Sequence, residues 1–220
     1  MKAADQQLVR ARMRSLFFKK GQLVFHEHGI PTGVYFLEEG KAKIFKVGIN
    51  GKEQIFYIYK QGDLLGYHSV ICDEYYMDSC ETLEPCKVSF ISRDDFFQLM
   101  DEIPEFRSLL IKNLGHEFAV MVNTITILAQ KTVRERLAIY LIVLRERYRE
   151  SSHQEPVISL PREDLANVIG TARETLTRLL REFKEAKYIH IHKREIRILD
   201  IKELKKQAAI PIKLDDVVDE

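Results

Sequence analysis

The stretch that decides the fold is Gly170-Thr171-Ala172-Arg173-Glu174-Thr175-Leu176-Thr177-Arg178. It follows a short run, 162–169, whose apolar residues have helical spacing and which begins after Pro161. Proline suits the start of a helix, because its missing N–H would have no partner there. Gly170 suits the left-handed residue that ends a helix. We therefore predict helices over 162–169 and 172–186, with Thr171 as the N-cap of the second. Two short helices joined by such a turn form a helix-turn-helix.

The second helix of that motif enters the major groove of DNA, where its N-terminal residues reach the base edges. Arg173, Glu174 and Arg178 lie on the face of this helix away from Leu176 and Leu180. Arginine can donate two hydrogen bonds to guanine, and glutamate can accept one from cytosine. The same residues would also fit a solvated helix with Arg–Glu pairs. Beside these candidate base readers, the hydroxyl groups that could bind phosphate are Thr171, Thr175 and Thr177.

Two β-rich runs, 188–192 and 195–199, follow this helix and flank a basic pair. They predict a small hairpin with a basic tip, which is the wing of a winged helix. We expect His192, Lys193 and Arg194 to contact phosphate groups at this tip. The succession of helix, turn, helix and basic wing favours DNA binding. This combined pattern is far more specific for that function than any one of its parts.

The charge of the chain is unevenly distributed. Its formal net charge is +1, but residues 1–105 carry −3 and residues 131–207 carry +6. A basic region beside an acidic one suggests that one part meets a polyanion. Charge alone fits an Arg- and Glu-rich helix surface equally well, so the interpretation depends on the motifs.

A long apolar seam precedes the DNA-binding motif. Residues 104–130 contain one glycine and no proline after Pro104, and a further helix is predicted over 133–150. The seam recurs every three or four residues and consists of Ile111, Leu114, Phe118, Met121, Ile125 and Leu128. It spans only about 2.5 heptads, fewer than a coiled coil normally needs. The seam can pair with its copy in a parallel homodimer, pack on the β-rich part of its own chain, or do both.

The first hundred residues have a β character. Short apolar runs rich in β-branched and aromatic residues lie at 22–25, 34–37, 41–47, 54–59 and 86–91. Asn50-Gly51 separates two of them and favours a tight hairpin turn. Several short strands at this spacing predict a sandwich or jelly-roll barrel.

The whole order resembles the CRP/FNR family, named for the cyclic-AMP receptor protein and the fumarate-nitrate reduction regulator. Tyr35–Gly40 and Gly62–Gly66 are similar to its cyclic-nucleotide-binding-type domain. Gly170–Arg178 is similar to its recognition helix, in which Arg-Glu-x-x-x-Arg reads the operator. The resemblance covers about residues 15–200. It implies a homodimer on a palindromic operator in double-stranded DNA, and RNA polymerase as a further partner.

On these grounds we predict an α+β protein with three parts and a tail. Residues 1–103 form a cyclic-nucleotide-binding-like jelly-roll β-barrel, and residues 104–131 form a dimerisation helix. Residues 132–205 form a winged helix-turn-helix, and residues 206–220 form a tail with an acidic end. An effector in the barrel would shift its packing on the dimerisation helix and, through residues 131–134, turn both recognition helices.

The predicted sensor pocket departs from the pattern of the members that bind cyclic AMP. Those members carry Gly-Glu for the ribose and Arg-Ser for the phosphate. This chain has Gly66-Tyr67 at the first place and Tyr75-Tyr76-Met77-Asp78, without arginine, near the second. A buried phosphate with no facing cation is poorly compensated, so we do not expect cyclic AMP to bind. Candidate residues for another small molecule are Gly66, Tyr67, His68, Ser69, Tyr76, Met77, Met121 and Val122. The alternative is that the aromatic residues fill the barrel and nothing binds.

Redox and metal chemistry are weaker alternatives. The iron–sulfur members of the family use an N-terminal cysteine cluster, and this chain has no cysteine before Cys72. We therefore expect no iron–sulfur cluster, and we interpret Cys72, Cys80 and Cys86 as buried reduced thiols. A haem- or redox-sensing regulator with ligands from His26, His28 and His68 is an alternative, but we predict no metal site.

Other functional classes find less support in the sequence. The chain has no nucleophile–base motif, phosphate loop, paired-metal signature or Gly-rich cofactor fingerprint, so we predict no enzyme. It has no apolar run of about 18 residues and no secretory signal, so we expect a cytoplasmic protein with no membrane partner. A ligand-controlled signalling adaptor built on the same barrel remains an alternative, and the winged helix argues against it.

Overall fold

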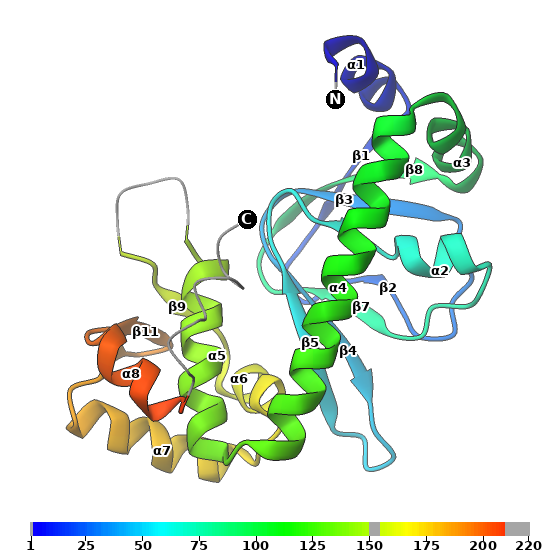
Figure 1. Cartoon of the computed structure of the whole chain (residues 1–220). Helices are drawn as coiled ribbons and strands as arrows, with labels where there is room; N and C mark the ends of the chain where they lie inside the picture. Colours follow the sequence, from blue (N-terminus) through cyan, green and yellow to red (C-terminus); the bar gives the residue numbers. More distant parts are fainter. Residues whose placement is uncertain (1, 150–154, 210–220) are drawn as a thin grey trace. The chain divides into compact units, whose positions relative to one another are not determined.

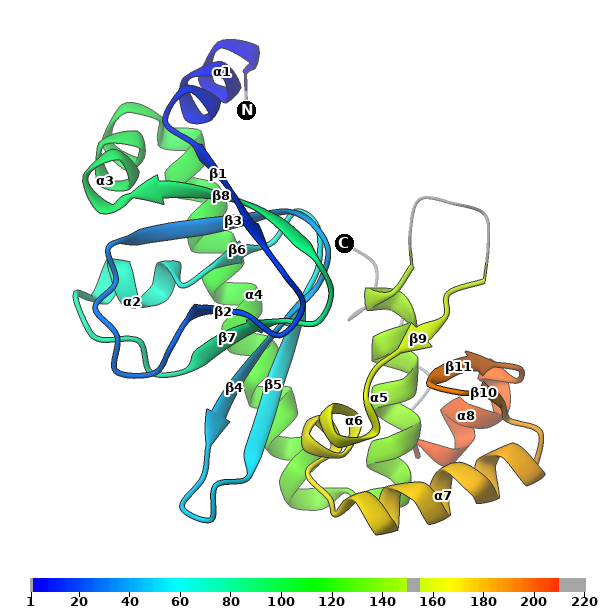
Figure 2. The same ribbon diagram turned by 180° about the vertical axis from the view of Figure 1, so that it is seen from behind.

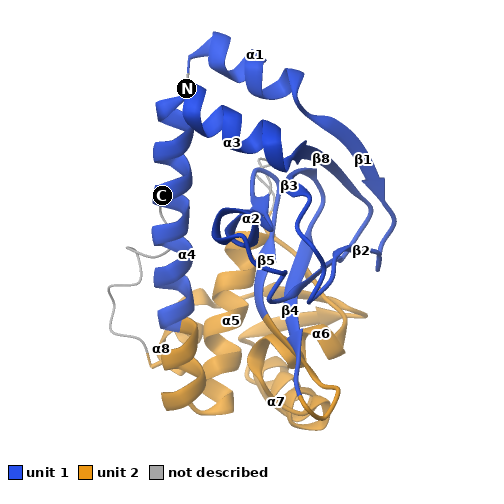
Figure 3. Ribbon diagram, turned by 90° about the vertical axis from the view of Figure 1, so that its right-hand side faces the viewer, with its two compact units in different colours: residues 1–48, 56–123 blue, residues 49–55, 124–220 orange. Residues whose placement is uncertain are grey.

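The computed structural model describes residues 2–149 and 155–209. The chain divides into two compact units, which Figure 3 distinguishes by colour. Unit 1 comprises residues 1–48 and 56–123, and unit 2 comprises residues 49–55 and 124–220. The short segment 49–55, at the tip of a hairpin, thus belongs with the C-terminal part of the chain.

Unit 1 contains two antiparallel four-stranded sheets, as the β-rich runs predicted. The first has the order β1-β8-β3-β6, which Figure 2 shows from behind, and the second has the order β2-β7-β4-β5. Their strands are β1 (Arg14–Phe18), β2 (Leu23–Phe25), β3 (Gly33–Glu39), β4 (Ala42–Val47), β5 (Glu53–Tyr59), β6 (Leu64–Leu65), β7 (Ser79–Thr82) and β8 (Cys86–Ser92). The hairpin predicted at Asn50-Gly51 is confirmed, since β4 and β5 are neighbours and Gly51 has a φ of +71°.

The central strands β3 and β8 of the first sheet have buried side chains on both faces. Successive side chains of a strand point to opposite sides, so each strand contributes to two cores. Leu37 faces Val88 across the β3–β8 pair, and both belong to the core cluster that also holds residues of the second sheet. Val34 faces Ile91, and this pair belongs to a second cluster under the helices. Burial on both faces explains why β3 reads as the continuous apolar run 34–37.

Four helices complete the framework of unit 1. They are α1 (Ala3–Ala11), α2 (Tyr67–Cys72), α3 (Arg93–Glu102) and the start of α4 (Pro104–Gln130), the long helix in green in Figure 1. The second cluster includes Val9 of α1, Phe96 of α3 and Leu110 of α4. The bounds of α4 confirm the predicted helix 104–130. Across the described ranges, no helix has the length and apolar character needed to span a membrane.

Unit 2 contains the predicted winged helix-turn-helix. Its elements are α5 (Val133–Arg147), β9 (Ile158–Ser159), α6 (Arg162–Ile169), α7 (Arg173–Glu185), β10 (Ile189–His192), β11 (Glu195–Ile198) and α8 (Ile201–Gln207). The hydroxyl of Thr132 and the carboxylate of Glu135 form a capping box at the start of α5. The core of unit 2 contains the fully buried side chains of Leu141 on α5, Leu165 on α6 and Phe183 on α7. The polar break 151–154 and the acidic end 215–220 lie outside the described residues.

The beginning of α7 differs by one residue from the prediction. Ala172, rather than Thr171, is the N-cap residue, and no side chain caps this helix. The N–H of Thr171 donates to the carbonyl of Ala166 (3.1 Å), which closes the turn at Gly170 and draws Thr171 inward until it is 8% exposed. The turn therefore includes Thr171, and the helix begins after it.

Candidate nucleic-acid interface

The turn before α7 requires glycine on two grounds. Gly170 has a φ of +70°, a left-handed conformation that glycine adopts without steric cost. A β-carbon added there would lie 3.1 Å from Cδ2 of Leu128 and 3.2 Å from Oε1 of Gln54, closer than ordinary contact. The predicted left-handed end of α6 is confirmed, and this turn determines where α7 starts.

The three predicted base readers share the exposed side of α7. Arg173 and Glu174 occupy its first turn, and Arg178 follows one turn later with 65% of its side chain exposed. Together with Thr177 and Arg181, they line one open depression on the surface of unit 2. Leu176, Leu179, Leu180 and Phe183 bury the opposite side. The arrangement leaves guanidinium and carboxylate groups exposed on one side of α7, and these are groups that can bond to base edges.

A carboxylate holds Arg178 in an extended position along the helix. Nη1 of Arg178 lies 2.6 Å from Oε1 of Glu182, and the other oxygen of Glu182 lies 2.6 Å from Nη1 of Arg134 on α5. Because a guanidinium has five N–H donors, Arg178 retains donors for a base while Glu182 orients it. Arg181, which the sequence analysis missed, lies on the same face and pairs with Glu185 at 2.8 Å. Arg181 follows Glu174 by seven residues, a spacing that places two residues on the same face of a helix, and this was the signal in the sequence that could have found it.

The three predicted phosphate-binding threonines are not equivalent. Thr171 is buried, and Thr175 is half-buried. Thr177 is exposed, but its hydroxyl donates to the carbonyl of Arg173 at 2.8 Å. The inward turn removes the side chain of Thr171 from the surface, so of these three threonines Thr177 is the exposed one.

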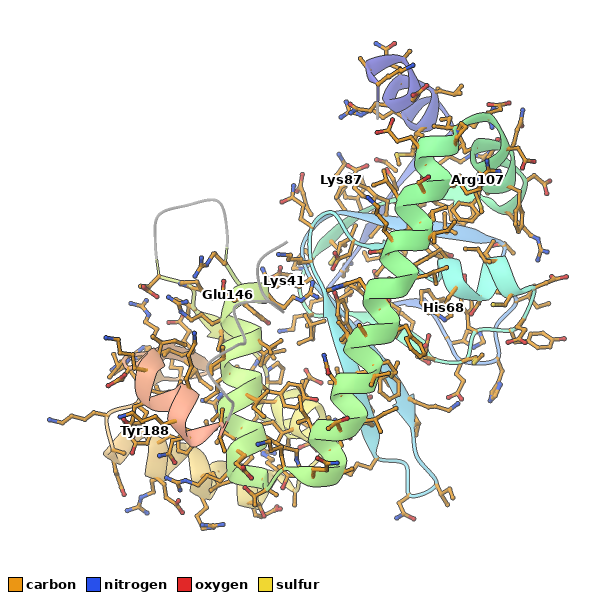
Figure 4. All side chains as sticks on the ribbon, in the orientation of Figure 1. Lys41, His68, Lys87, Arg107, Glu146 and Tyr188 are labelled. Carbon is orange, nitrogen blue, oxygen red and sulfur yellow. The ribbon has the colours of Figure 1, made fainter. Side chains whose placement is uncertain are left out.

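The predicted wing is confirmed as the β10–β11 hairpin. Its pairing places His192 opposite Glu195, with Lys193 and Arg194 at the tip, and Lys193 has a φ of +52°. His192, Lys193 and Arg194 are all exposed. Figure 4 labels Tyr188, which lies between α7 and this hairpin.

Arg162, the first residue of α6, supports the wing and was not predicted. Its Nη1 donates to the carbonyl of Arg194 and its Nη2 to the carbonyl of Lys193, each at 3.3 Å. Partial burial lowers the pKa of Arg162 from its usual high value, and an arginine so shifted still carries its charge at neutral pH. Three cationic side chains thus gather at one edge of unit 2.

The predicted effector residues divide between two cores of unit 1. Tyr76 stacks on Phe25 in the core between the sheets, with ring centroids 4.1 Å apart. A β-carbon on Gly66, which is also buried, would lie only 2.9 Å from the ring of Tyr76. Tyr67 belongs to the other cluster, and its hydroxyl accepts a hydrogen bond from Nδ2 of Asn113 on α4 (2.9 Å). Met77, Met121 and Val122 are exposed by 52%, 45% and 46%.

Near α2 lies a largely buried acid whose pKa is strongly raised. Asp78 Oδ2 lies 3.8 Å from Nε2 of His68, which Figure 4 labels, and Asp78 Oδ1 is buried without a hydrogen-bond partner. Burial, followed by the nearby charge of Glu27, raises the pKa of Asp78 to about 7, although Lys46 opposes this shift. Burial also lowers the pKa of His68. Ser69, 2% exposed, has a second unpartnered oxygen.

The thiols and histidines show little sign of redox or metal chemistry. Cys80 and Cys86 are buried, and burial raises the pKa of both thiols, which disfavours the reactive thiolate. The prediction of a buried thiol is wrong for Cys72, which ends the short helix α2 at the surface and is exposed. His28 is also exposed. Among the described residues, no three His, Cys, Asp or Glu side chains gather in a way that could hold a metal ion.

The seam of α4 is largely exposed within one chain. Ile111, Phe118, Met121 and Ile125 are exposed by 63%, 71%, 45% and 60%, whereas Leu114 and Leu128 are half-buried. Leu114 packs on the cluster beneath α3 and α4. A stripe of this size on one helix is unusual on a monomer surface.

Two family models match the chain. Residues 15–103 match the model of the cyclic nucleotide-binding domain, and residues 135–207 match that of the Crp-like helix-turn-helix domain. The transcriptional activator protein Anr of Pseudomonas aeruginosa is 30% identical over 189 residues, which are 84% of this chain and 77% of that protein. The fumarate and nitrate reduction regulatory protein of Vibrio cholerae is 28% identical over 196 residues, 87% of this chain and 77% of that protein.

Solved structures share the fold. FixK2 from Bradyrhizobium japonicum superposes with a TM-score of 0.81 at 18% identity, covering 90% of this chain and 98% of that one. The c-di-GMP responsive global regulator CLP of Xanthomonas campestris superposes with a TM-score of 0.80 at 17% identity, covering 90% and 100%.

The raised pKa of Asp78 predicts a pH-dependent stability. The folded chain holds the proton of this carboxyl more tightly than the unfolded chain does, so its contribution to the free energy of unfolding is full below pH 4 and declines as the pH rises to about 7. We expect Asp78→Asn to be more stable than the wild type at pH 8 by about 2–4 kcal/mol, with a smaller difference at pH 5. Urea unfolding followed by circular dichroism at both pH values measures this.

The exposed residue Asp94 provides the matched control. Asp94→Asn should change the free energy of unfolding little and equally at the two pH values. An Asp78→Asn variant that is less stable than the wild type at pH 8 would contradict the assignment.

Proposed function

The chain belongs to the CRP/FNR family of transcription regulators, and from this membership we propose that it acts as a homodimer on a palindromic operator. Its Crp-like helix-turn-helix domain makes it a DNA-binding regulator. The observation that carries the finer proposal is the exposed set Arg173, Glu174 and Arg178 at the start of α7, flanked by a basic wing. In the proposed complex this set reads bases in the major groove, and Lys193 and Arg194 bind phosphate.

The homodimer rests on the seam of α4. Four of its six apolar residues are exposed in one chain, and burying them against a second copy removes that apolar surface from water. A two-fold dimer would place two recognition helices on half-sites one helical turn apart, about 34–36 Å. A palindromic operator follows from this symmetry, and RNA polymerase is the partner that a transcription regulator of this kind would recruit or hinder.

We propose further that the effector, where one acts, differs from cyclic AMP. The unpartnered oxygen of Asp78 and the neutral form of His68 offer no cation to a phosphate in this part of unit 1. Tyr76 and Phe25 fill the core between the sheets. These observations support a small-molecule effector without a phosphate at this place, or regulation that needs no ligand.

The proposal predicts an operator-binding activity that cyclic AMP does not change. An operator is selected from random DNA with the purified protein, and fluorescence anisotropy then measures its dissociation constant with and without cyclic AMP. We expect the same constant in both conditions. Binding that occurs only with cyclic AMP would refute the proposed effector class, and failure to enrich any sequence in either condition would refute sequence-specific binding.

Loss of a base-reading residue and loss of a phosphate-binding residue should change different properties of DNA binding. Arg178→Ala should relax the preference at one base pair by about 1–3 kcal/mol. Lys193→Ala should weaken binding to all sequences alike and reduce the slope of log affinity against log salt by about 1. Titrations against the operator, its single-base variants and unrelated DNA at several salt concentrations distinguish these effects.

Lys184, exposed near the C-terminal end of α7, supplies the control. It lies on a different face from Arg178, so Lys184→Ala should preserve the base preference. If Lys193→Ala relaxed the base preference while Arg178→Ala reduced only the salt slope, the two roles would be assigned the wrong way round.

The dimer is tested by placing a charge in the seam. Phe118→Glu should dissociate the homodimer at micromolar concentration, because the interface would then bury an unpaired carboxylate. Sedimentation velocity measures the state of association, and Lys112→Glu changes an exposed residue of α4 outside the seam. A Phe118→Glu protein that sediments as the wild type does would refute this interface.

A further inference from the structure

Two helices of unit 2 end close to the recognition helix with carbonyl groups that need donors. The last four carbonyls of a helix have no partner within that helix. α6 ends at Ile169 and Gly170, directly before the turn into α7, and α4 ends at Gln130. The groups that satisfy these carbonyls therefore also fix how the two helix ends lie relative to each other.

Arg136, in the first turn of α5, binds carbonyls of both ends. Its Nε donates to the carbonyl of Ile169 at 2.9 Å, and its Nη2 donates to that of Gly170 at 3.1 Å. Its Nη1 donates to the carbonyls of Leu128 at 3.3 Å and Lys131 at 3.0 Å. One planar guanidinium thus joins the C-terminal end of α4 to the turn that leads into α7.

The electrostatics favour a cation at this point. The C-terminal end of a helix carries a partial negative charge, and positive side chains near it are stabilising. Arg136 lies at the C-terminal ends of two helices at once. A planar guanidinium with five donors can bond to carbonyls of both ends, whereas a single ammonium group cannot. The capping box of Thr132 and Glu135 fixes the turn from which Arg136 projects, and the next residue, Leu137, is fully buried.

The neighbouring carbonyls of the turn have separate donors. Nε2 of Gln54 donates to the carbonyl of Asn167 at 2.8 Å, and Nζ of Lys52 donates to that of Thr171 at 2.9 Å. The donor groups of Gln54 and Lys52 are already used in these two bonds, so neither side chain can replace Arg136 at Ile169 and Gly170. Loss of the guanidinium would leave the carbonyls of Ile169 and Gly170 without these donors.

We propose that Arg136 is a positioning residue for operator recognition: its guanidinium sets the direction of α7 relative to the end of α4. The inference rests on the proposed function, because α4 would carry the two-fold axis of the homodimer. The angle between α4 and α7 then determines whether two recognition helices reach successive major grooves together. Arg136 itself contacts no DNA in this proposal.

The test compares Arg136→Lys with Arg145→Lys. Both residues lie on α5, but Arg145 pairs with Glu146 and Glu155 side chains rather than with helix ends. Lysine keeps the charge of Arg136 and loses the fork of donors. We expect Arg136→Lys to bind the selected operator about 5- to 150-fold more weakly, an effect comparable to one mismatched base pair. Its affinity for unrelated DNA and its salt slope should be unchanged, and Arg145→Lys should bind as the wild type does.

Two readouts separate positioning from a general loss of structure. The first readout uses operators whose half-sites are one base pair closer together or further apart. The loss of affinity caused by this change of spacing should be smaller for Arg136→Lys than for the wild type. Amide hydrogen exchange, measured on the free protein well below its unfolding temperature, should rise at residues 169–172 and stay unchanged in the core of unit 2. This second readout depends neither on DNA nor on dimerisation.

Each outcome bears on the proposal. Unchanged operator affinity or unchanged exchange at the turn in Arg136→Lys would overturn it. Exchange that rises equally throughout unit 2, with specific and non-specific affinity falling together, would also overturn it, because Arg136 would then only stabilise the fold. A wild-type protein that prefers no DNA sequence would refute the proposed function instead, and the exchange result would still show whether Arg136 holds the turn.

Discussion

The direction of α7 depends on the left-handed backbone at Gly170. This residue ends α6 with a φ of +70°, and the N–H of Thr171 closes the turn on Ala166. Any larger residue would meet both backbone strain and a close approach to Leu128. Leu176, Leu180 and Phe183 then bury the inner face of α7, so its outer face is fixed as well. The positions of the exposed arginines follow from this one turn, and the proposed reading of DNA depends on it.

Arginine has two different tasks in unit 2, and net charge does not separate them. The guanidinium groups of Arg136 and Arg162 are bound to main-chain carbonyls, where they hold a turn and a wing. Arg173 and Arg178 are exposed on α7. The net charge of +6 over residues 131–207 therefore includes cations whose donors are already used inside the fold. By contrast, Arg173, Arg178 and the wing tip present exposed side chains at the surface of unit 2.

Sequence patterns predicted the elements whose stability is local. Helical periodicity located α4 and α6 with the bounds observed, and the glycine at 170 marked the turn. The pattern failed where long-range packing decides: β1 is an edge strand with mostly exposed residues, and Thr171 turns inward because a hydrogen bond five residues back draws it there. Arg136 and Arg162 looked like ordinary surface arginines, since the carbonyls that they bind in the turn after α6 and in the wing lie more than 30 residues away in the sequence. Such acceptors leave no trace in local spacing.

The region of α2 is tied to α4 by a polar contact within the chain. The hydroxyl of Tyr67, the first residue of α2, accepts a hydrogen bond from Asn113 of α4. The link between α2 and α4 is therefore made by the chain itself, without a ligand. Nearby, Asp78 Oδ1 and Ser69 Oγ are buried without partners. With a pKa of about 7, Asp78 exists in both forms near neutral pH. Its ionised carboxylate only accepts hydrogen bonds, whereas its protonated form can also donate one. The proton that Asp78 holds therefore decides which kind of hydrogen bond this buried group can make.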